Sequence, residues 1–167
     1  VSLLDFARRR ETTHSPIGLL PMGKTCLPAT SAAGRSALKI GGADLEFDVT
    51  DGRRRLSCQM RDFAAGQSLE AEIELSDEPA ASMVIAPPVP EKPPAVYYNQ
   101  KIIGMRARGT IGYQGRQIEL RPEKSFGLLD WGRGVWTYDN TWYWGAGQGL
   151  VDGHVFGFNI GYGFGDT

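Results

Sequence analysis

The chain has 167 residues, of which 41% are hydrophobic and 22% are charged, and its 18 basic side chains nearly balance its 19 acidic ones. This length suits one domain with a real core, and the small net charge excludes the positive field with which proteins attract nucleic acid. No apolar run approaches the roughly 20 residues of a membrane helix, and no export signal opens the chain, so we expect a cytoplasmic chain without a membrane span.

The chain begins irregularly and then changes to strand periodicity. Residues 1–35 show no sustained period and are interrupted by prolines, so we expect an irregular segment with one short strand around Leu3 to Arg8. Residues 36–86 form a first hairpin group in which apolar and polar side chains alternate, and Asp51-Gly52 is a two-residue turn signal. Centring a hairpin on that pair sets three cross-strand pairs: Leu45 with Cys58, Phe47 with Leu56 and Asp48 with Arg55.

The middle of the chain continues as strands around a proline-rich linker. The stretch SLEAEIELSD keeps period two, with apolar side chains inward and glutamates outward, which is typical of a half-buried antiparallel strand. Residues 87–95 hold five prolines and predict an extended linker. Residues 96–167 are expected to form an aromatic and glycine-rich β segment that is truncated at its end. Its first hairpin turns at Gln114-Gly115, which pairs Ile111 with Ile118 and Thr110 with Glu119.

All four tryptophans and many glycines lie between Asp130 and Asp166. Asp152-Gly153 reads as a hairpin turn. Folding about it sets five pairs: Trp142 with Gly163, Trp144 with Gly161, Gly145 with Ile160, Gly147 with Phe158 and Gly149 with Phe156. Two explanations stay open. Either large side chains cover strand glycines, which holds the register of a curved sheet, or one face lines a cavity for an apolar ligand.

The cavity explanation has its own candidate residues. The ligand-binding candidates are Trp131, Trp136, Tyr138, Trp142, Trp144, Gln148 and Asn159. Asp130 shares the apolar face of a strand with Phe126 and Leu128, where a carboxylate needs a partner, and Arg133 is the nearest cation along the chain. The two residues form either a structural ion pair or a catalytic pair, with Asp130 as general acid or base and Arg133 as a substrate clamp.

The residues predict no cofactor and no metal. GLLPMGKT, residues 18–25, matches the phosphate-loop pattern, but no strand precedes it and Pro28 prevents a helix after it. The sequence holds two histidines, His14 and His154, and two cysteines at unrelated spacings, which does not suit zinc. Free thiols are the favoured state of Cys26 and Cys58, with a single bridge between them as the alternative.

No stretch keeps helical periodicity over three turns, so we predict an all-β chain folded as an antiparallel β-barrel or sandwich. The segments YYNQKIIGM, SFGLLDWGRGVWTYDNTWYWGAG and FGFNIGYGFGD resemble the bacterial family catalogued as domain of unknown function 2804, and GLLPMGKTCLP resembles that family's earlier segment. The resemblance implies an incomplete part of a larger two-lobed β protein. More remotely, the family is similar to lipocalin-like barrels of the hydroxyneurosporene synthase type.

The resemblance carries over no known catalytic residues. The leading hypothesis is binding, with or without modification, of a small apolar or lipid-like molecule in a tryptophan-lined β cavity. The alternative is a non-enzymatic structural or protein-interaction module. The residues do not decide whether a reaction is catalysed, nor the oligomeric state.

Overall fold

The computed structural model of the chain describes residues 1–17, 25–76, 79, 82–89, 95–136, 139 and 141–163. These residues form antiparallel strands and no helix, which confirms the all-β prediction. No helix with the length and apolar character needed to cross a membrane is therefore found among them. The expected cytoplasmic location stays a prediction. The chain divides into two compact units, residues 1–75 with 108–121 and residues 76–107 with 122–167.

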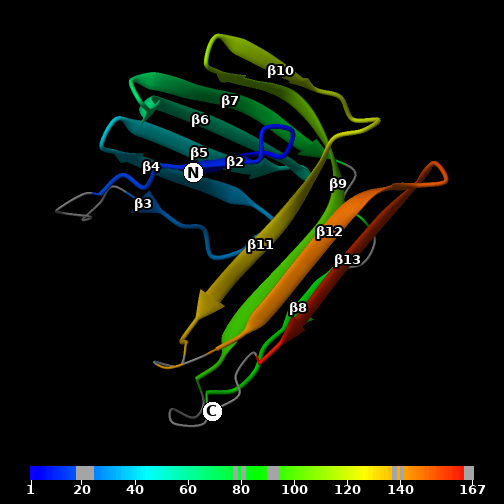
Figure 1. The fold of residues 1–167 in the computed structure, drawn as a ribbon. Helices are drawn as coiled ribbons and strands as arrows, with labels where there is room; N and C mark the ends of the chain where they lie inside the picture. The colour runs from blue at the N-terminus through cyan, green and yellow to red at the C-terminus, as the bar shows by residue number, and fades with distance from the viewer. Residues whose placement is uncertain are drawn as a thin grey trace. The chain divides into compact units, whose positions relative to one another are not determined.

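The first unit is an open antiparallel sheet, in which Figure 1 shows the middle strands side by side. Its strand order is β10 (Arg116–Leu120), β9 (Tyr97–Tyr113), β7 (Gln67–Ser76), β6 (Arg53–Ala64), β5 (Ala43–Thr50), β4 (Gly34–Ile40) and β3 (Thr25–Cys26). Only residues 108–113 of β9 belong to this unit. Because β10 and β3 are edges, the described residues close no barrel here, and a sandwich is the expected architecture that fits.

A separate hairpin of β1 (Ser2–Asp5) and β2 (Arg10–Thr13) opens the chain. The sequence predicts one strand running to Arg8, whereas the structure turns after Asp5. The carboxylate of Asp5 accepts the amide of Arg8 at 3.0 Å, and Arg9 has a φ of 52°. Strands of four residues are too short to show a period of two, and the turn lacks glycine, so the pattern does not reveal the second strand.

The three predicted hairpin turns are confirmed. Both residues of Asp51-Gly52, Gln114-Gly115 and Asp152-Gly153 have positive φ, as tight hairpin turns of the mirror-image type require. The predicted registers are confirmed with them: Phe47 pairs with Leu56, Ile111 with Ile118, and Trp144 with Gly161. The turns are local signals, so they are visible in the sequence.

The core of the first unit is a small cluster of side chains. Its members are buried to 2–3% exposure, namely Ala43, Met60, Phe63 and Leu69, and Leu3 of β1 packs against them. Cys58 also packs against the cluster and is a free thiol, as the sequence predicts for it. Partial burial raises the pKa of the Cys58 thiol.

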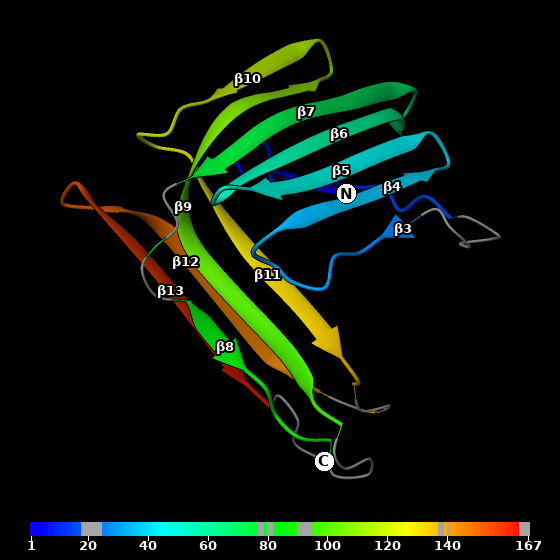
Figure 2. The same cartoon turned by 180° about the vertical axis from the view of Figure 1, so that it is seen from behind.

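The second unit joins β8 (Met83–Ile85), β11 (Phe126–Gly134) and residues 97–107 of β9, together with the hairpin of β12 (Tyr143–Val151) and β13 (His154–Tyr162), as Figure 2 shows. A β-bulge interrupts the ladder of β9 and β11. Met105 pairs with Gly127 and Ile103 with Leu128, which leaves Gly104 as the extra residue, at a φ of +88°. Glycine suits this position because it has no Cβ to clash at positive φ.

The proline-rich segment is described only at its two ends. Pro88 forms an isolated bridge with Val96, and the amide of Val89 donates to the carbonyl of Ala95 at 2.9 Å. Residues 90–94 lie outside the described residues. The predicted boundaries of the segments 1–35, 36–86, 87–95 and 96–167 stay predictions.

Candidate functional site

The β12–β13 hairpin packs one face, here called the inner face, on β9 within the second unit. A Cβ at Gly157 would lie 2.7 Å from Cγ2 of Ile103, and a Cβ at Gly104 would lie 3.1 Å from Cγ1 of Val155. Gln148 adds a polar contact, since its Oε1 accepts the amide of Gly104 at 2.8 Å. Two glycines therefore allow the hairpin and the strand to approach closely.

The opposite, outer face of the hairpin is exposed. Its apolar row consists of Phe156, Phe158, Ile160 and Tyr162, which are 45–73% exposed. A Cβ at Gly147 would overlap the Phe158 ring, so this ring covers the glycine on the neighbouring strand. The explanation of the glycines by aromatic cover therefore has direct support on this face.

A buried lysine lies under the inner face. Lys101 is 4% exposed, and its Nζ lies 2.5 Å from Oδ2 of Asp130 and 4.4 Å from the centre of the Trp144 ring. Oδ1 of Asp130 accepts a hydrogen bond from Nδ2 of Asn99 at 3.1 Å. Burying an ammonium group is costly unless it is paired, and here the carboxylate and the ring face supply partners.

The partner of Asp130 differs from the one that the sequence suggests. Lys101 stands directly opposite Asp130 in the ladder of β9 and β11, whereas Arg133 stands opposite Tyr98. Because β11 continues to Gly134, the odd spacing between Asp130 and Arg133 sends their side chains to opposite faces. The ion pair therefore forms with Lys101, and the catalytic roles of Asp130 and Arg133 stay predictions.

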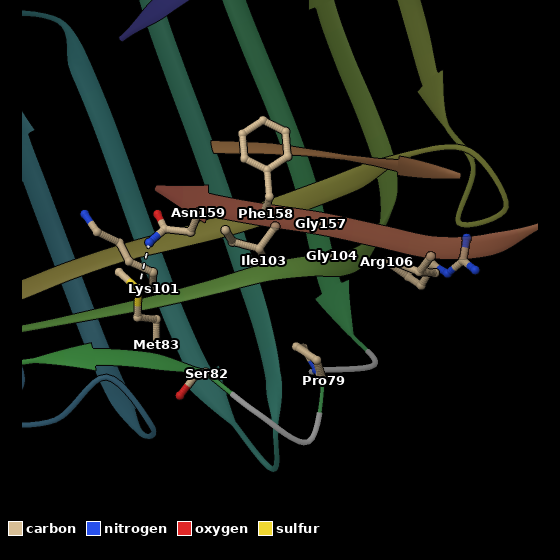
Figure 3. A pocket seen from close by; sticks show the side chains of 11 residues that line it. Pro79, Ser82, Met83, Lys101, Ile103, Gly104, Arg106, Gly157, Phe158 and Asn159 are labelled. Carbon is tan, nitrogen blue, oxygen red and sulfur yellow. Dashed lines mark hydrogen bonds between the residues drawn. The ribbon is translucent and has the colours of Figure 1, made fainter. Parts of the chain in front are cut away.

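An open hollow of about 540 Å³ lies next to Lys101, as seen in Figure 3. Its apolar side chains include Met83, Ile103 and Val155. Its polar lining includes Ser82, Lys101, Arg106 and Asn159. Lys101 and Arg106 lie toward opposite ends of the row of labelled residues in Figure 3. The hollow is thus apolar along its middle and carries a cationic side chain toward each end.

Asn159 is held firmly at this hollow. Its Oδ1 accepts the indole N–H of Trp144 at 2.5 Å, and its Nδ2 donates to Sδ of Met83 at 3.1 Å. The second of these bonds is the dashed line in Figure 3. Trp144 therefore contacts both Asn159 and the Lys101 side chain, and it connects the ion pair to the lining of the hollow.

The other predicted ligand-binding residues are distributed over the second unit. The Trp136 ring stacks on Tyr97 at 5.5 Å between centroids, and the Trp131 ring meets Tyr98 edge-on at 5.8 Å. Trp142 is 53% exposed. Tyr138 lies outside the described residues, as do residues 18–24 of the phosphate-loop-like segment. Of the predicted residues that the structure describes, Asn159 is the one that lines the hollow.

Sequence reasoning missed both cations of the hollow. The alternation in YYNQKIIGM places Lys101 on one face with Tyr97 and Ile103, and the argument that singled out Asp130 applies to this lysine as well. For Arg106, neither the alternation nor the burial rule indicates that it faces the hollow. The bulge at Gly104 shifts the alternation by one position and so brings Arg106 to the face of Ile103.

Comparison with known proteins adds one match. A family model described as a domain of unknown function (DUF2804) matches residues 1–167, which include the hollow and the Lys101–Asp130 pair. No curated protein and no solved structure matches the chain.

Proposed function

Since the chain belongs to the family of domain of unknown function 2804, and that description names no activity, we propose from the geometry that the second unit binds a small apolar or lipid-like molecule. The hollow over β9 is the proposed site. The observation that carries the proposal is its lining, which combines apolar side chains with a few polar groups. A volume of about 540 Å³ is in the range of ligand pockets in general.

The Lys101–Asp130 pair takes the place of the predicted Asp130–Arg133 pair in this proposal. Asp130 and Trp144 hold the Lys101 side chain in place, so this part of the lining is pre-organised before a molecule binds. Trp144 is not among the lining residues. It contacts Lys101 and Asn159, which do line the hollow, so in this proposal it supports the site and does not form its wall. Binding alone accounts for these features, and no chemical step is assigned. Lipocalin-like architecture stays a prediction.

A binding test needs a variant that fills the hollow and one that does not. Val155 lines the hollow, whereas Val151 is of the same residue type, is similarly exposed and lies outside the lining. We expect the full chain to bind the neutral apolar dye Nile red, and Val155→Phe to weaken binding about tenfold because the added ring occupies the site. Val151→Phe should bind as the unaltered chain does, as measured by fluorescence titration.

Two results would count against the hollow as the site. One is the absence of dye binding by the unaltered chain. The other is equal affinity of the Val155→Phe variant and the unaltered chain. Native mass spectrometry of the chain purified without detergent offers a separate measurement. It should show an adduct that is lost on denaturation.

A non-enzymatic interaction module is the second candidate, and the outer face of β12–β13 favours it. A contiguous row of exposed apolar side chains on a folded protein often marks an interaction surface. Replacing Phe156 and Ile160 by serine separates the two candidates. Loss of dye binding in that double variant, with normal binding in Val155→Phe, would favour the interaction module.

A further inference from the structure

Arg106 is a cation whose described contacts leave one edge of its guanidinium open. Its Nη1 donates to the backbone carbonyls of Pro122 at 2.9 Å and Glu123 at 3.3 Å. The guanidinium carbon lies 4.9 Å from the centre of the Phe126 ring. These contacts fix the group in place, and among the described residues none accepts a bond from its Nε or Nη2.

The charges of the two cations of the hollow are balanced differently. Lys101 is paired with Asp130, whereas no described carboxylate forms an ion pair with Arg106. The described residues that line the hollow include no aspartate or glutamate. Among the described residues, the positive charge of Arg106 at the hollow therefore has no carboxylate partner.

From this imbalance we infer that the molecule bound in the hollow carries an anionic group, which Arg106 holds through Nε and Nη2. These two N–H donors form one edge of the planar guanidinium and match the two oxygens of a carboxylate. The apolar body of the molecule then lies along Ile103, Val155 and Met83. The ligand class is thus an anionic amphiphile of the fatty-acid kind. This inference rests on the proposed function, because it specifies the ligand of the same site.

The test compares two probes of equal chain length that differ in charge. Dodecanoate and dodecan-1-ol are used to displace Nile red from the full chain. We expect dodecanoate to bind at least about tenfold more tightly than the alcohol, as charge-assisted bidentate bonds allow. Arg106→Gln should abolish this preference, so that the variant binds dodecanoate and dodecan-1-ol with equal affinity. Arg116→Gln is the matched control, because Arg116 is exposed on β10 and does not line the hollow, and it should keep the full preference.

The outcomes distinguish failure of the inference from failure of the proposed function. Equal binding of both probes by the unaltered chain, or a preference that survives in Arg106→Gln, overturns the inference and leaves the site intact. Absence of dye binding and of both probes overturns the proposed function as well. If Arg106→Gln does not fold, Arg106→Lys replaces it. Lysine keeps the charge but not the two-donor edge, so an intermediate preference supports the inference and an unchanged one contradicts it.

Discussion

Glu74 on β7 forms ion pairs with three arginines on the sheet of the first unit. Its carboxylate lies 3.1 Å from Nη1 of Arg53, 3.6 Å from Nε of Arg55 and 2.5 Å from Nη2 of Arg108. The Glu74 side chain is 15% exposed. Partial burial alone would raise the pKa of the Glu74 carboxyl, but the charge and hydrogen bond of Arg108, with the charges of Arg53 and Arg55, outweigh it and hold that pKa below its usual value.

This network predicts a stability difference that depends on pH. Glu74→Gln should lower the free energy of unfolding by about 1 kcal/mol at pH 7, since the partner arginines are exposed and each pair is weak. Because the folded pKa of Glu74 is depressed, its contribution is present above the unfolded value of about 4.5 and is lost as pH falls through the lower folded pKa. Urea titrations at pH 7, 5 and 3 measure this difference.

The control for Glu74 is a carboxylate with an exposed partner. Glu119→Gln removes a pair with Arg121 in which both side chains are about 60% exposed, and we expect little change at any pH. A loss for Glu74→Gln that is equally large at pH 3 and at pH 7 would show that its cause is packing rather than charge.

At the level of single elements, the β12 strand offers two glycines in different surroundings. A Cβ at Gly147 would overlap the Phe158 ring, whereas a Cβ at Gly149 would meet no atom within 4 Å. Both glycines belong to the same strand and the same hairpin register, opposite phenylalanines. Comparing alanine substitutions at Gly147 and Gly149 therefore distinguishes the effect of the covering Phe158 ring from the general cost of glycine in a strand.

We expect Gly147→Ala to destabilise the protein by about 1–3 kcal/mol, because the Phe158 ring must move to admit the methyl group. Gly149→Ala should be neutral or slightly stabilising, because alanine reduces the entropy of the unfolded chain without a clash. Urea unfolding followed by tryptophan fluorescence measures both variants. Equal effects of the two substitutions would contradict the aromatic-cover explanation of the hairpin.

At the scale of the whole molecule, small net charge coincides with exposed apolar surface. The chain carries a net charge of −1 at pH 7 and has an isoelectric point near 6.2. The apolar row of the outer face, Phe156 to Tyr162, is exposed. Charge repulsion that would keep two molecules apart is weakest near the isoelectric point, where this row is free to drive association.

We therefore expect self-association to be strongest near pH 6 and to decrease toward pH 8, as light scattering at fixed protein concentration would record. Replacing Phe156 and Ile160 by serine should reduce the association at every pH, because it interrupts the apolar row. Ser57→Ala is a control on the polar surface of the first unit, where Ser57 bonds Glu72, and it should leave the pH profile unchanged. Association that stays constant from pH 5 to pH 8 would exclude this mechanism.

The candidate site could be predicted from the sequence only in part. Alternation in β12 and β13 places Trp144, Gln148 and Asn159 on one face, and these three residues contact the Lys101 region and β9 as that face packs inward. The burial rule for charged residues singles out Asp130 and applies equally to Lys101. The burial rule could not predict that Lys101 is the partner of Asp130, nor that Arg106 faces the hollow. Both depend on how β9 pairs with β11.

The sequence by itself determined the strand class and the hairpin registers. Turn pairs such as Asp51-Gly52 and Asp152-Gly153, and a side-chain period of two, are properties of neighbouring residues, and they decide pairing before any long-range contact forms. Only the tertiary structure decided that Lys101 meets Asp130 and that the bulge at Gly104 brings Arg106 into the hollow. The physical reason is that pairing between strands far apart in the chain is selected by packing over the whole sheet, and that one extra residue in a strand reverses which side chains share a face.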